Sequence, residues 1–380
     1  MILPGATLGL LGGGQLGRYF TIAARNAGYG VWVLDPDPSA PAAAFATRHL
    51  CAAYDDPPAL AELGAGCAVV TTEFENAPAA ALQALANDHG VPVRPPAAAV
   101  GVAQHRILEK QFFRDCGLPV GPFAAIHDAD GIDAAVAAVQ YPAIIKTARF
   151  GYDGKGQVRV ANAVQAANEL RANPGLLPCV VEQQLDLERE ISVVLGRSVD
   201  GQMQCFPVAE NRHTGGILDV SMAPADIPPA LASEARRIAM QIADQLDYVG
   251  VLGVEFFVVA GGRLVLNEMA PRPHNSGHYT IDAGACSQFE QQVRLVCGFA
   301  PLDPKPGSAA VMVNLLGDIW RDGPPDWAAL LANPHCHLHL YGKEDARPGR
   351  KMGHFTVTGA SLSDALPQAL KLRSHLGVGD

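Results

Sequence analysis

The sequence lacks any concentration of positive charge. Its 380 residues carry a formal net charge of −10, from 28 Lys and Arg against 38 Asp and Glu, and no segment gathers basic residues into a long block. A nucleic-acid groove needs a basic stripe that neutralises phosphates. We therefore expect no nucleic-acid partner, and we expect anions to bind only where local groups reverse the negative field.

Long apolar runs and paired cysteines are also missing, and we expect the first residues to form a strand and a turn rather than a signal peptide. No uninterrupted hydrophobic stretch reaches the length of a membrane-spanning helix, and the eight Cys form no C-x-x-C pair. The first apolar run has no basic segment before it, as a signal peptide would. These absences predict a cytoplasmic protein with no membrane partner and with buried, reduced thiols.

What remains is a globular composition with the pattern of an α/β protein. Hydrophobic residues make up 49% of the chain and charged residues 17%, and the length suggests two or three domains. Strand and helix signals alternate near the start, which is typical of a parallel sheet. The expected elements there are strands at 7–11, 31–34 and 68–72, and a helix at 15–27.

A glycine pattern follows the first expected strand. Gly12, Gly14 and Gly17 have the spacing of a dinucleotide-binding turn, and Asp35 ends the next strand, where it would meet a ribose. A single match of this kind indicates a Rossmann-like domain more strongly than it indicates NAD. An NAD-dependent dehydrogenase stays open as an alternative, and the helix N-terminus would favour an anion such as a substrate phosphate.

Two glutamates flank a Gly-Gly pair at a spacing that favours a hairpin. If Gly261 and Gly262 form a two-residue turn, Ala260 faces Arg263, Phe257 faces Leu266 and Glu255 faces Glu268. Facing carboxylates repel each other unless a cation lies between them. In strands that are otherwise apolar, Mg²⁺ bound to phosphates is the natural partner. The alternative is a pair of solvated glutamates, and a slipped register would separate them.

A second glycine-rich segment begins just after an apolar strand at 143–147. Lys146 lies late in that strand, Lys155 lies in the loop, and three glycines leave backbone N–H groups free to approach phosphates; they are Gly151, Gly154 and Gly156. No helix follows, so this is not a Walker loop. It suggests a hairpin lid over the β- and γ-phosphates, and the alternative is an ordinary glycine hairpin.

Together these segments resemble the ATP-grasp superfamily and, within it, the N5-carboxyaminoimidazole ribonucleotide synthetases of purine biosynthesis. The resemblance rests on GGGQLG (12–17), TTEFEN (71–76), KTARFGYDGKGQ (146–157), ENRH (210–213), NEMAPRPHNSGHYT (267–280) and YGK…RPGRKMGH (341–354). Two departures are Phe150, where the family usually has a second glycine, and Gln183-Gln184 in the expected adenine hinge. The first puts the mobility of the lid in doubt, but not its role.

The resemblance implies an α/β and α+β multidomain architecture. It places a Rossmann-like domain at 1–100 and an ATP-grasp domain at 101–300, whose flexible lid covers about 120–180. A small C-terminal β-rich domain would follow at 301–380. The implied reaction is the ATP-dependent carboxylation of 5-aminoimidazole ribonucleotide with bicarbonate through carboxyphosphate, which yields ADP and phosphate. It implies one or two Mg²⁺ ions and a homodimer.

The family motifs also imply site residues. The ATP site would comprise Arg106, Lys146, Gly151, Tyr152, Asp153, Gly154, Lys155, Gly156, Gln157, Glu182, Gln183, Gln184, Leu185, Glu190, His213, Asn267 and Glu268. Magnesium would be held by Glu255 and Glu268. Bicarbonate and its catalysis would use Arg272, His274, Asn275 and Asp153. The ribonucleotide would contact Gln15, Leu16, Glu73, Tyr152, Lys155, Arg272, His274, Arg350 and Lys351.

Three further interpretations stay open. The chain could be another ATP-grasp ligase, such as a formate-using glycinamide ribonucleotide transformylase, or a nucleotide sensor without turnover.

His335, His337 and His339 alternate, so a strand would place them on one face. A zinc site there lacks a clear fourth ligand in the sequence, and a solvated strand face is the preferred interpretation.

Overall fold

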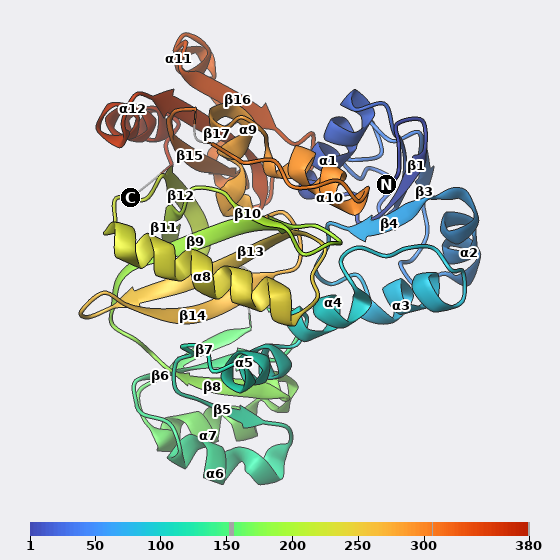
Figure 1. Cartoon of the computed structure of the whole chain (residues 1–380). Coiled ribbons are helices and arrows are strands. Elements are labelled where there is room, and N and C mark those ends of the chain that lie inside the picture. Colours follow the sequence, from blue (N-terminus) through green and yellow to red (C-terminus); the bar gives the residue numbers. More distant parts are fainter. Residues whose placement is uncertain (152–155, 306, 379–380) are drawn as a thin grey trace.

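The computed structural model describes residues 1–151, 156–305 and 307–378, and in these ranges the strands form three sheets (Figure 1). Tyr152, Asp153, Gly154 and Lys155, which we expect in the lid loop, lie outside the described residues.

The N-terminal sheet is parallel, with the strand order β3-β2-β1-β4. Its strands are β1 (Thr7–Leu11), β2 (Gly30–Leu34), β3 (Arg48–Leu50) and β4 (Val69–Thr72). Helices α1 (Gln15–Asn26), α2 (Pro57–Gly66), α3 (Ala79–Asn87) and α4 (Ala97–Ala103) accompany it. The expected strands and helix are confirmed, with bounds that differ by a residue at most, because apolar strand and Gly turn alternate clearly here.

The lid region forms a separate antiparallel sheet, the lower lobe in Figure 1, with the order β5-β8-β6-β7. Its elements are β5 (Phe123–Ile126), α6 (Ile132–Ala137), β6 (Ala143–Thr147), β7 (Gln157–Val160), α7 (Ala163–Ala172) and β8 (Cys179–Gln183). The side chain of Asn162 caps α7 by accepting the N–H of Gln165. The glycine-rich segment joins β6 to β7, as the sequence predicts.

The central sheet runs in the order β14-β13-β9-β11-β12-β15-β17-β16, and β10 pairs with β9. Its strands are β9 (Leu187–Arg197), β10 (Met203–Cys205), β11 (Ala209–Thr214), β12 (Ile217–Ala223), β13 (Gly250–Val259), β14 (Arg263–Ala270), β15 (Ala309–Leu316), β16 (Cys336–Leu340) and β17 (Lys351–Gly359). The associated helices are α5 (Arg106–Asp115), α8 (Pro229–Gln245), α9 (Thr280–Ala283), α10 (Gln288–Val296), α11 (Ala328–Leu331) and α12 (Leu362–His375). Because β12 pairs with β15, the C-terminal strands continue the central sheet rather than forming one of their own.

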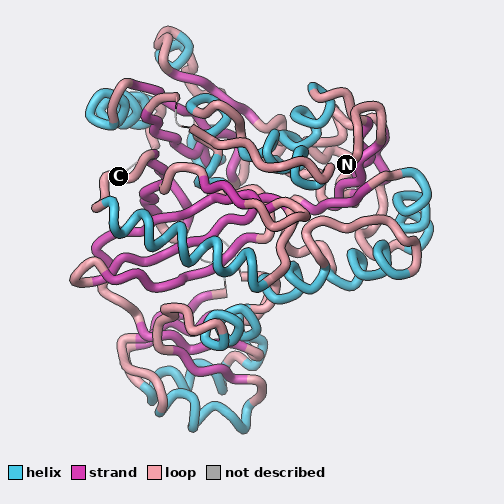
Figure 2. The backbone as a smooth tube through the Cα atoms, in the orientation of Figure 1, coloured by secondary structure: helices cyan, strands magenta, loops and turns pink. Residues whose placement is uncertain are grey.

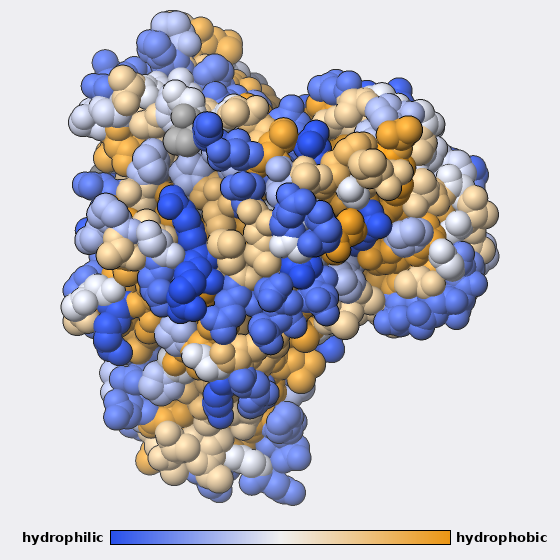
Figure 3. Space-filling view, in the orientation of Figure 1, coloured by the Kyte–Doolittle hydropathy of each residue, from blue (hydrophilic) through white to orange (hydrophobic). Residues whose placement is uncertain are grey.

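Helix α8 lies along the central strands (Figure 2). Its buried positions are small or aliphatic, such as Ala235, Ile238 and Ile242, and hydrophilic side chains cover its outer side (Figure 3). No helix in the described part of the chain has both the length and the hydrophobicity needed to cross a bilayer.

The cysteines match the expectation only in part. All eight lie within the described residues, and none is in a disulfide. Cys67, Cys179, Cys286 and Cys297 are buried, whereas Cys51 is exposed.

The hairpin of β13 and β14 pairs Glu255 with Glu268, although the predicted turn is wrong. Val259 faces Arg263 and Phe257 faces Val265, so the loop has three residues instead of two. A β-bulge then shifts the register between Glu255 and Phe256 and restores the predicted pairing at the glutamates. The extra residue on β14 is Asn267, whose amide Nδ2 donates to Glu255 Oε2 at 3.4 Å.

The turn after β1 needs glycine at its first position. Gly12 has φ +98°, and a Cβ there would lie 2.7 Å from Phe74 Cβ and 2.8 Å from Glu73 Oε1. Gly5 has a similar φ of +96°, but no atom lies within 4 Å of the position that its Cβ would take. Alanine substitutions at these two glycines therefore distinguish the cost of backbone strain, present at both, from the cost of steric crowding, present only at Gly12.

We expect Gly5→Ala to lower the free energy of unfolding by roughly 1–2 kcal/mol, the cost of a left-handed alanine. Gly12→Ala should lower it by about 1–3 kcal/mol more, because the methyl group would overlap the β4 loop. Urea denaturation of both variants measures the difference. Equal losses would show that the close approach to Phe74 is unimportant.

Candidate active site

A cavity opens between the lid sheet and the edge of the central sheet. Its apolar walls include Ile144 from β6 and Phe257 and Leu266 from β13 and β14. Its remaining lining is Lys110, Gly121, Pro122, Lys146, Arg159, Glu182, Gln183, Gln184, Leu185, Leu187 and Val265. An apolar slot with charged groups at one end suits a flat base that carries phosphates. The expected hinge residues therefore line a cavity of the appropriate kind.

Two buried lysines share one carboxylate at the charged end. Lys146 Nζ lies 3.0 Å and Lys110 Nζ 3.3 Å from Glu182 Oε2. Burial opposes ionisation of Glu182, but the two lysines outweigh it and lower the pKa of this carboxyl to about 2. The side chain of Glu182 thus holds both lysines, while its Oε1 has no hydrogen-bond partner among the described residues.

One face of α5 points toward the same end of the cavity. Arg106 Nη2 lies 3.2 Å from Glu268 Oε2. The carboxyl Oε1 of Glu109 accepts the N–H of Met269 at 2.7 Å, and this contact fixes the backbone next to Glu268. Lys110 completes this face, since positions i, i+3 and i+4 of a helix adjoin. The family resemblance implies Arg106 but does not include Lys110. The spacing of Arg106 and Lys110, which places both cations on one face of the helix, is the sequence signal that could have found Lys110.

The two facing glutamates differ in electrostatic environment. Burial and the negative charge of Glu268 raise the pKa of Glu255 to about 7. Burial also disfavours the charged form of Glu268, but Arg106 and Lys146 outweigh it, so its pKa is lowered. A divalent cation between the pair would remove the repulsion that raises the pKa of Glu255, and hard oxygen ligands fit Mg²⁺.

Glu190 and His213 meet beside this pair. His213 Nδ1 lies 3.1 Å from Glu190 Oε2, on neighbouring strands β11 and β9. Burial opposes a charged imidazole, but Glu190 and Glu255 raise the pKa of His213 overall. The structure thus brings both expected nucleotide contacts to the same end of the sheet as the carboxylate pair.

The loop after β14 supplies two of the expected oxyanion groups. Arg272 Nη2 forms an ion pair with Glu75 Oε2 of the N-terminal region, and burial lowers the pKa of Arg272 to about 10. His274 Nε2 lies 3.3 Å from Glu255 Oε1, and its Nδ1 lies 2.8 Å from Ser276 Oγ. Burial and the nearby Arg272 hold the pKa of His274 well below its usual value, so the ring is neutral at pH 7.

A buried chain of hydrogen bonds reaches His274 through Ser276. Ser276 Oγ accepts from Ser192 Oγ, which in turn accepts the amide of Asn211, and Ser221 donates to Asn211 Oδ1. Such a network fixes the ring orientation, because each polar group has a partner.

Asn275 departs from its expected role. It is buried, its amide Nδ2 donates to Asn314 Oδ1 at 3.1 Å, and its Oδ1 accepts from Asn314 Nδ2 at 2.7 Å. Both ends of the amide are therefore used by the fold. The expectation that this side chain faces bicarbonate is not met in this structure.

The N-terminal glycine turn is closed by the protein's own carboxylates. The N–H of Gly13 donates to Asp35, and those of Gly14 and Gly17 donate to Glu73. These are the groups that a dinucleotide pyrophosphate would need, so the dehydrogenase alternative is wrong for this site. Burial raises the pKa of Glu73, and its hydrogen bonds to the turn limit what it can offer a substrate.

The remaining residues that we expect to contact the ribonucleotide do not all lie in one place. Lys343 Nζ donates to Gln15 Oε1 at 2.7 Å, and it was missed because 328 residues separate the two. Lys343 also donates to the carbonyl of Lys351, so the segment that carries Lys351 does reach the N-terminal turn. Leu16, in contrast, is buried in the hydrophobic core beneath the sheet, so only its backbone could contact a substrate. Arg350 donates to the carbonyl of Asp345 on an exposed loop.

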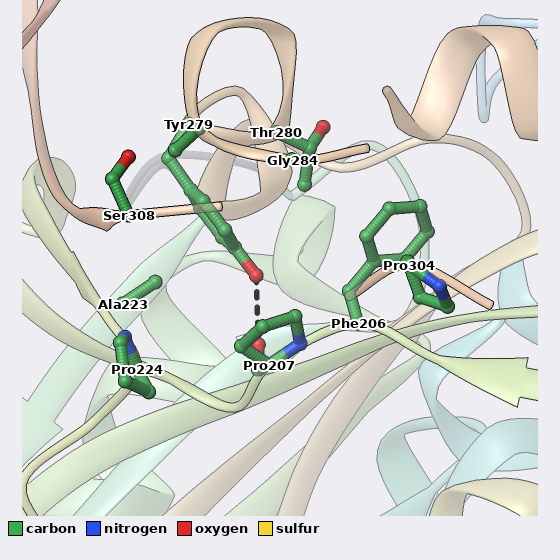
Figure 4. A pocket seen from close by; sticks show the side chains of 10 residues that line it. Phe206, Pro207, Ala223, Pro224, Tyr279, Thr280, Gly284, Pro304 and Ser308 are labelled. Atoms are coloured by element: carbon green, nitrogen blue, oxygen red, sulfur yellow. Dashed lines mark hydrogen bonds between the residues drawn. The ribbon is translucent and has the colours of Figure 1, made fainter. Parts of the chain in front are cut away.

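A second, small cavity lies beneath α9 and is unrelated to these groups (Figure 4). Apolar and proline side chains such as Phe206, Pro207 and Pro224 form its walls. The Tyr279 hydroxyl donates to the Pro207 carbonyl at 2.8 Å, as Figure 4 shows. This lining offers no charged group for chemistry.

Comparison with known families decides the assignment. The ribonucleotide synthetase preATP-grasp domain matches residues 5–104, the ATP-grasp domain matches 111–289, and the phosphoribosylaminoimidazole carboxylase C-terminal domain matches 310–368. The chain is 46% identical over 355 residues to the N5-carboxyaminoimidazole ribonucleotide synthase of Brucella melitensis, an alignment that covers 93% of this chain and 96% of that protein. The chain belongs to the N5-carboxyaminoimidazole ribonucleotide synthase family.

Solved structures of the family agree with this assignment. An ADP complex of an N5-carboxyaminoimidazole ribonucleotide synthetase has a TM-score of 0.92 and 39% identity, and the alignment covers 100% of this chain and 98% of that one. The Aspergillus clavatus enzyme in complex with ADP and 5-aminoimidazole ribonucleotide has a TM-score of 0.86 and 28% identity, over 98% and 99% of the chains. The expected three-part ATP-grasp fold is therefore confirmed.

Glu182 offers a direct test of the charged end of the site. We expect Glu182→Gln to lower the free energy of unfolding at pH 7 by about 3–5 kcal/mol, since two buried lysines would lose their shared carboxylate. The exposed pair of Asp133 and Arg171 provides the control, and Asp133→Asn should cost less than about 1 kcal/mol.

The pH dependence of this loss has a fixed sign. The depressed pKa of Glu182 means that its contribution is present above the unfolded value of 4.5 and is lost as the pH falls toward about 2. Urea denaturation at several pH values measures it. A difference between wild type and Glu182→Gln that does not shrink in acid would contradict the pairing.

Proposed function

We propose that this enzyme carboxylates 5-aminoimidazole ribonucleotide with bicarbonate at the expense of ATP and forms N5-carboxyaminoimidazole ribonucleotide, ADP and phosphate. The observation that carries the proposal is a chain of contacts that begins at the charged end of the cavity, where Lys110, Lys146 and Glu182 line it. Arg106, on the same helix as Lys110, contacts Glu268, which pairs with Glu255. His274 in turn contacts Glu255 and follows Arg272 closely in the chain. The family relatives carry this name, and one of them binds ADP with the ribonucleotide.

The cavity provides a place for each part of ATP. The adenine would lie in the apolar slot between Ile144 and Phe257, against the backbone of Gln183 to Leu185. Lys146, with Lys110 and Arg106 beside it, would hold the phosphates. Glu255 and Glu268 would hold one or two Mg²⁺ ions, which when bound neutralise charge on the transferring phosphoryl group.

Arg272 and His274 would orient bicarbonate for attack on the γ-phosphorus. A bicarbonate oxygen forms the new P–O bond while the bond to ADP breaks, and carboxyphosphate results. Loss of phosphate from carboxyphosphate would release CO₂ in the site. The amine of the ribonucleotide would then attack the carbon of CO₂ to form the carbamate, and the amine proton would pass to the released phosphate. Arg272 suits the anion because a guanidinium offers paired donors. Its guanidinium would then contact both bicarbonate and Glu75.

We also propose that Gln15, Lys343 and Lys351 bind the ribonucleotide end that carries the phosphate, with Glu73 near the base. The domain division at 1–100, 101–300 and 301–380 remains part of this proposal. So do a cytoplasmic location and a homodimer, which family membership supports.

The test is ADP release by the purified enzyme with each substrate omitted in turn. We expect release to require both bicarbonate and 5-aminoimidazole ribonucleotide, and formate not to replace bicarbonate. Glu268→Gln should lower the rate by roughly 100-fold or more through loss of a cation ligand.

The matched control is Glu234→Gln on the exposed side of α8, where Glu234 pairs with Arg237 across one helical turn. It should leave the rate unchanged. Full activity of Glu268→Gln, or ADP release with formate in place of bicarbonate, would contradict the proposed reaction.

A further inference from the structure

Imidazole rings from distant segments gather where the C-terminal strands meet α9 and α1. His339 on β16 faces His354 on β17, and their rings are stacked with centroids 4.6 Å apart. The ring of His278 lies 4.9 Å from that of His354. The proposed carboxylation uses none of these three side chains.

A carboxylate joins this group from α9. Asp282 Oδ2 lies 2.9 Å and its Oδ1 3.1 Å from His339 Nε2, and one ligand atom each of Asp282, His339 and His354 lies within 4.8 Å of the others. His337 Nδ1 is 3.9 Å from Asp282 Oδ1 on the more exposed side. In a tetrahedral site, two ligand atoms about 2.0–2.2 Å from the ion lie roughly 3.3–3.6 Å apart. The contact between His339 and Asp282, now at hydrogen-bond distance, would therefore lengthen by about half an ångström around a bound ion.

His354 supplies an independent indication of a missing partner. The residue is fully buried, and its Nε2 has no hydrogen-bond partner among the described residues, whereas its Nδ1 lies 2.9 Å from the Tyr341 hydroxyl. Metal-binding histidines commonly donate their second ring N–H to an oxygen, which leaves the other nitrogen free for the ion. The Tyr341 hydroxyl oxygen is placed to accept that hydrogen bond.

One more polar atom in the same cluster of rings is buried without a described partner. It is His278 Nε2, and the ring of His278 lies 4.9 Å from that of His354. Buried polar atoms normally have a partner. Two such imidazole nitrogens in one place therefore point to a bound species.

We infer that Asp282, His339 and His354 form a site for a divalent transition metal of the zinc class, with His337 on its open side. Imidazole nitrogen and one carboxylate are the donors that such an ion prefers over Mg²⁺. The ion would connect β16 and β17 to α9. None of its three ligands belongs to the Glu255–Glu268 pair, so this would be a second, separate metal site. The role is structural, since none of these groups takes part in the proposed reaction.

The experiment is a Zn²⁺ titration of full-length, EDTA-treated enzyme against a chromophoric chelator, with excess Mg²⁺ and ADP to occupy the carboxylate pair. We expect one Zn²⁺ per chain in the micromolar range or tighter. His339→Gln and Asp282→Asn, both near the edge of the cluster, should weaken binding by at least about 10-fold.

Two controls separate this site from others. His335→Gln changes an exposed histidine just before β16, and Glu255→Gln changes the carboxylate pair; both should keep the Zn²⁺ equivalent. Co²⁺ gives a second readout, since the visible absorption of a bound ion should disappear in His339→Gln. No tight Zn²⁺ in the wild type, or unchanged binding in both His339→Gln and Asp282→Asn, would overturn the inference and leave the cluster as a hydrogen-bonded network filled by water.

Discussion

The face-to-face placement of Glu255 and Glu268 is the constraint on which the rest of the site depends. Two carboxylates that meet on neighbouring strands in a largely apolar sheet repel each other, so the fold bears a cost that a bound divalent cation would remove. The groups around the two glutamates differ, so the two carboxyls do not ionise equally easily. Arg106 lies against Glu268 and keeps it ionised, while Glu255 lies nearest to the neutral His274 and the amide of Asn267.

The other parts of the site are arranged around that pair. The lysines that would receive phosphates are held by Glu182 on the lid sheet, and the groups that would receive bicarbonate follow Glu268 directly in the chain. The N-terminal region takes part through Glu75, which contacts Arg272 across 197 residues. Its glycine turn contributes shape rather than a cofactor site, because Asp35 and Glu73 already satisfy its N–H groups.

Local patterns predicted many of the strands and glycine turns, whereas most of the expected site residues came from the family resemblance. Short apolar strands next to glycine turns were identifiable, as β1 and β6 show. The Glu255–Glu268 pairing was also predicted, but through two errors that cancel: the turn has one more residue than expected, and the bulge at Asn267 offsets it. A bulge of this kind has no reliable sequence signal, because one extra residue in a strand leaves the alternation of apolar side chains on either side of it looking regular.

Contacts between distant segments could not be predicted. Nothing local to Asn275 indicates that its amide is taken by Asn314, and nothing near Gln15 indicates Lys343. The departure at Phe150 has a structural counterpart: this residue has φ +61°, a conformation that glycine adopts without strain. The glycine that family members usually have here would adopt this positive φ without strain, which gives a physical reason for the family pattern.

The unfolding free energy of Glu255→Gln, compared with the wild type with and without Mg²⁺ and ADP, tests the central claim most directly. Without ligand the variant should be at least as stable as the wild type, because a like-charge pair is removed. With Mg²⁺ and ADP the wild type should gain more stability than the variant, through tighter binding to the folded state. A variant that is less stable without ligand, yet is stabilised equally by Mg²⁺ and ADP, would contradict the claim that the two carboxylates share a cation.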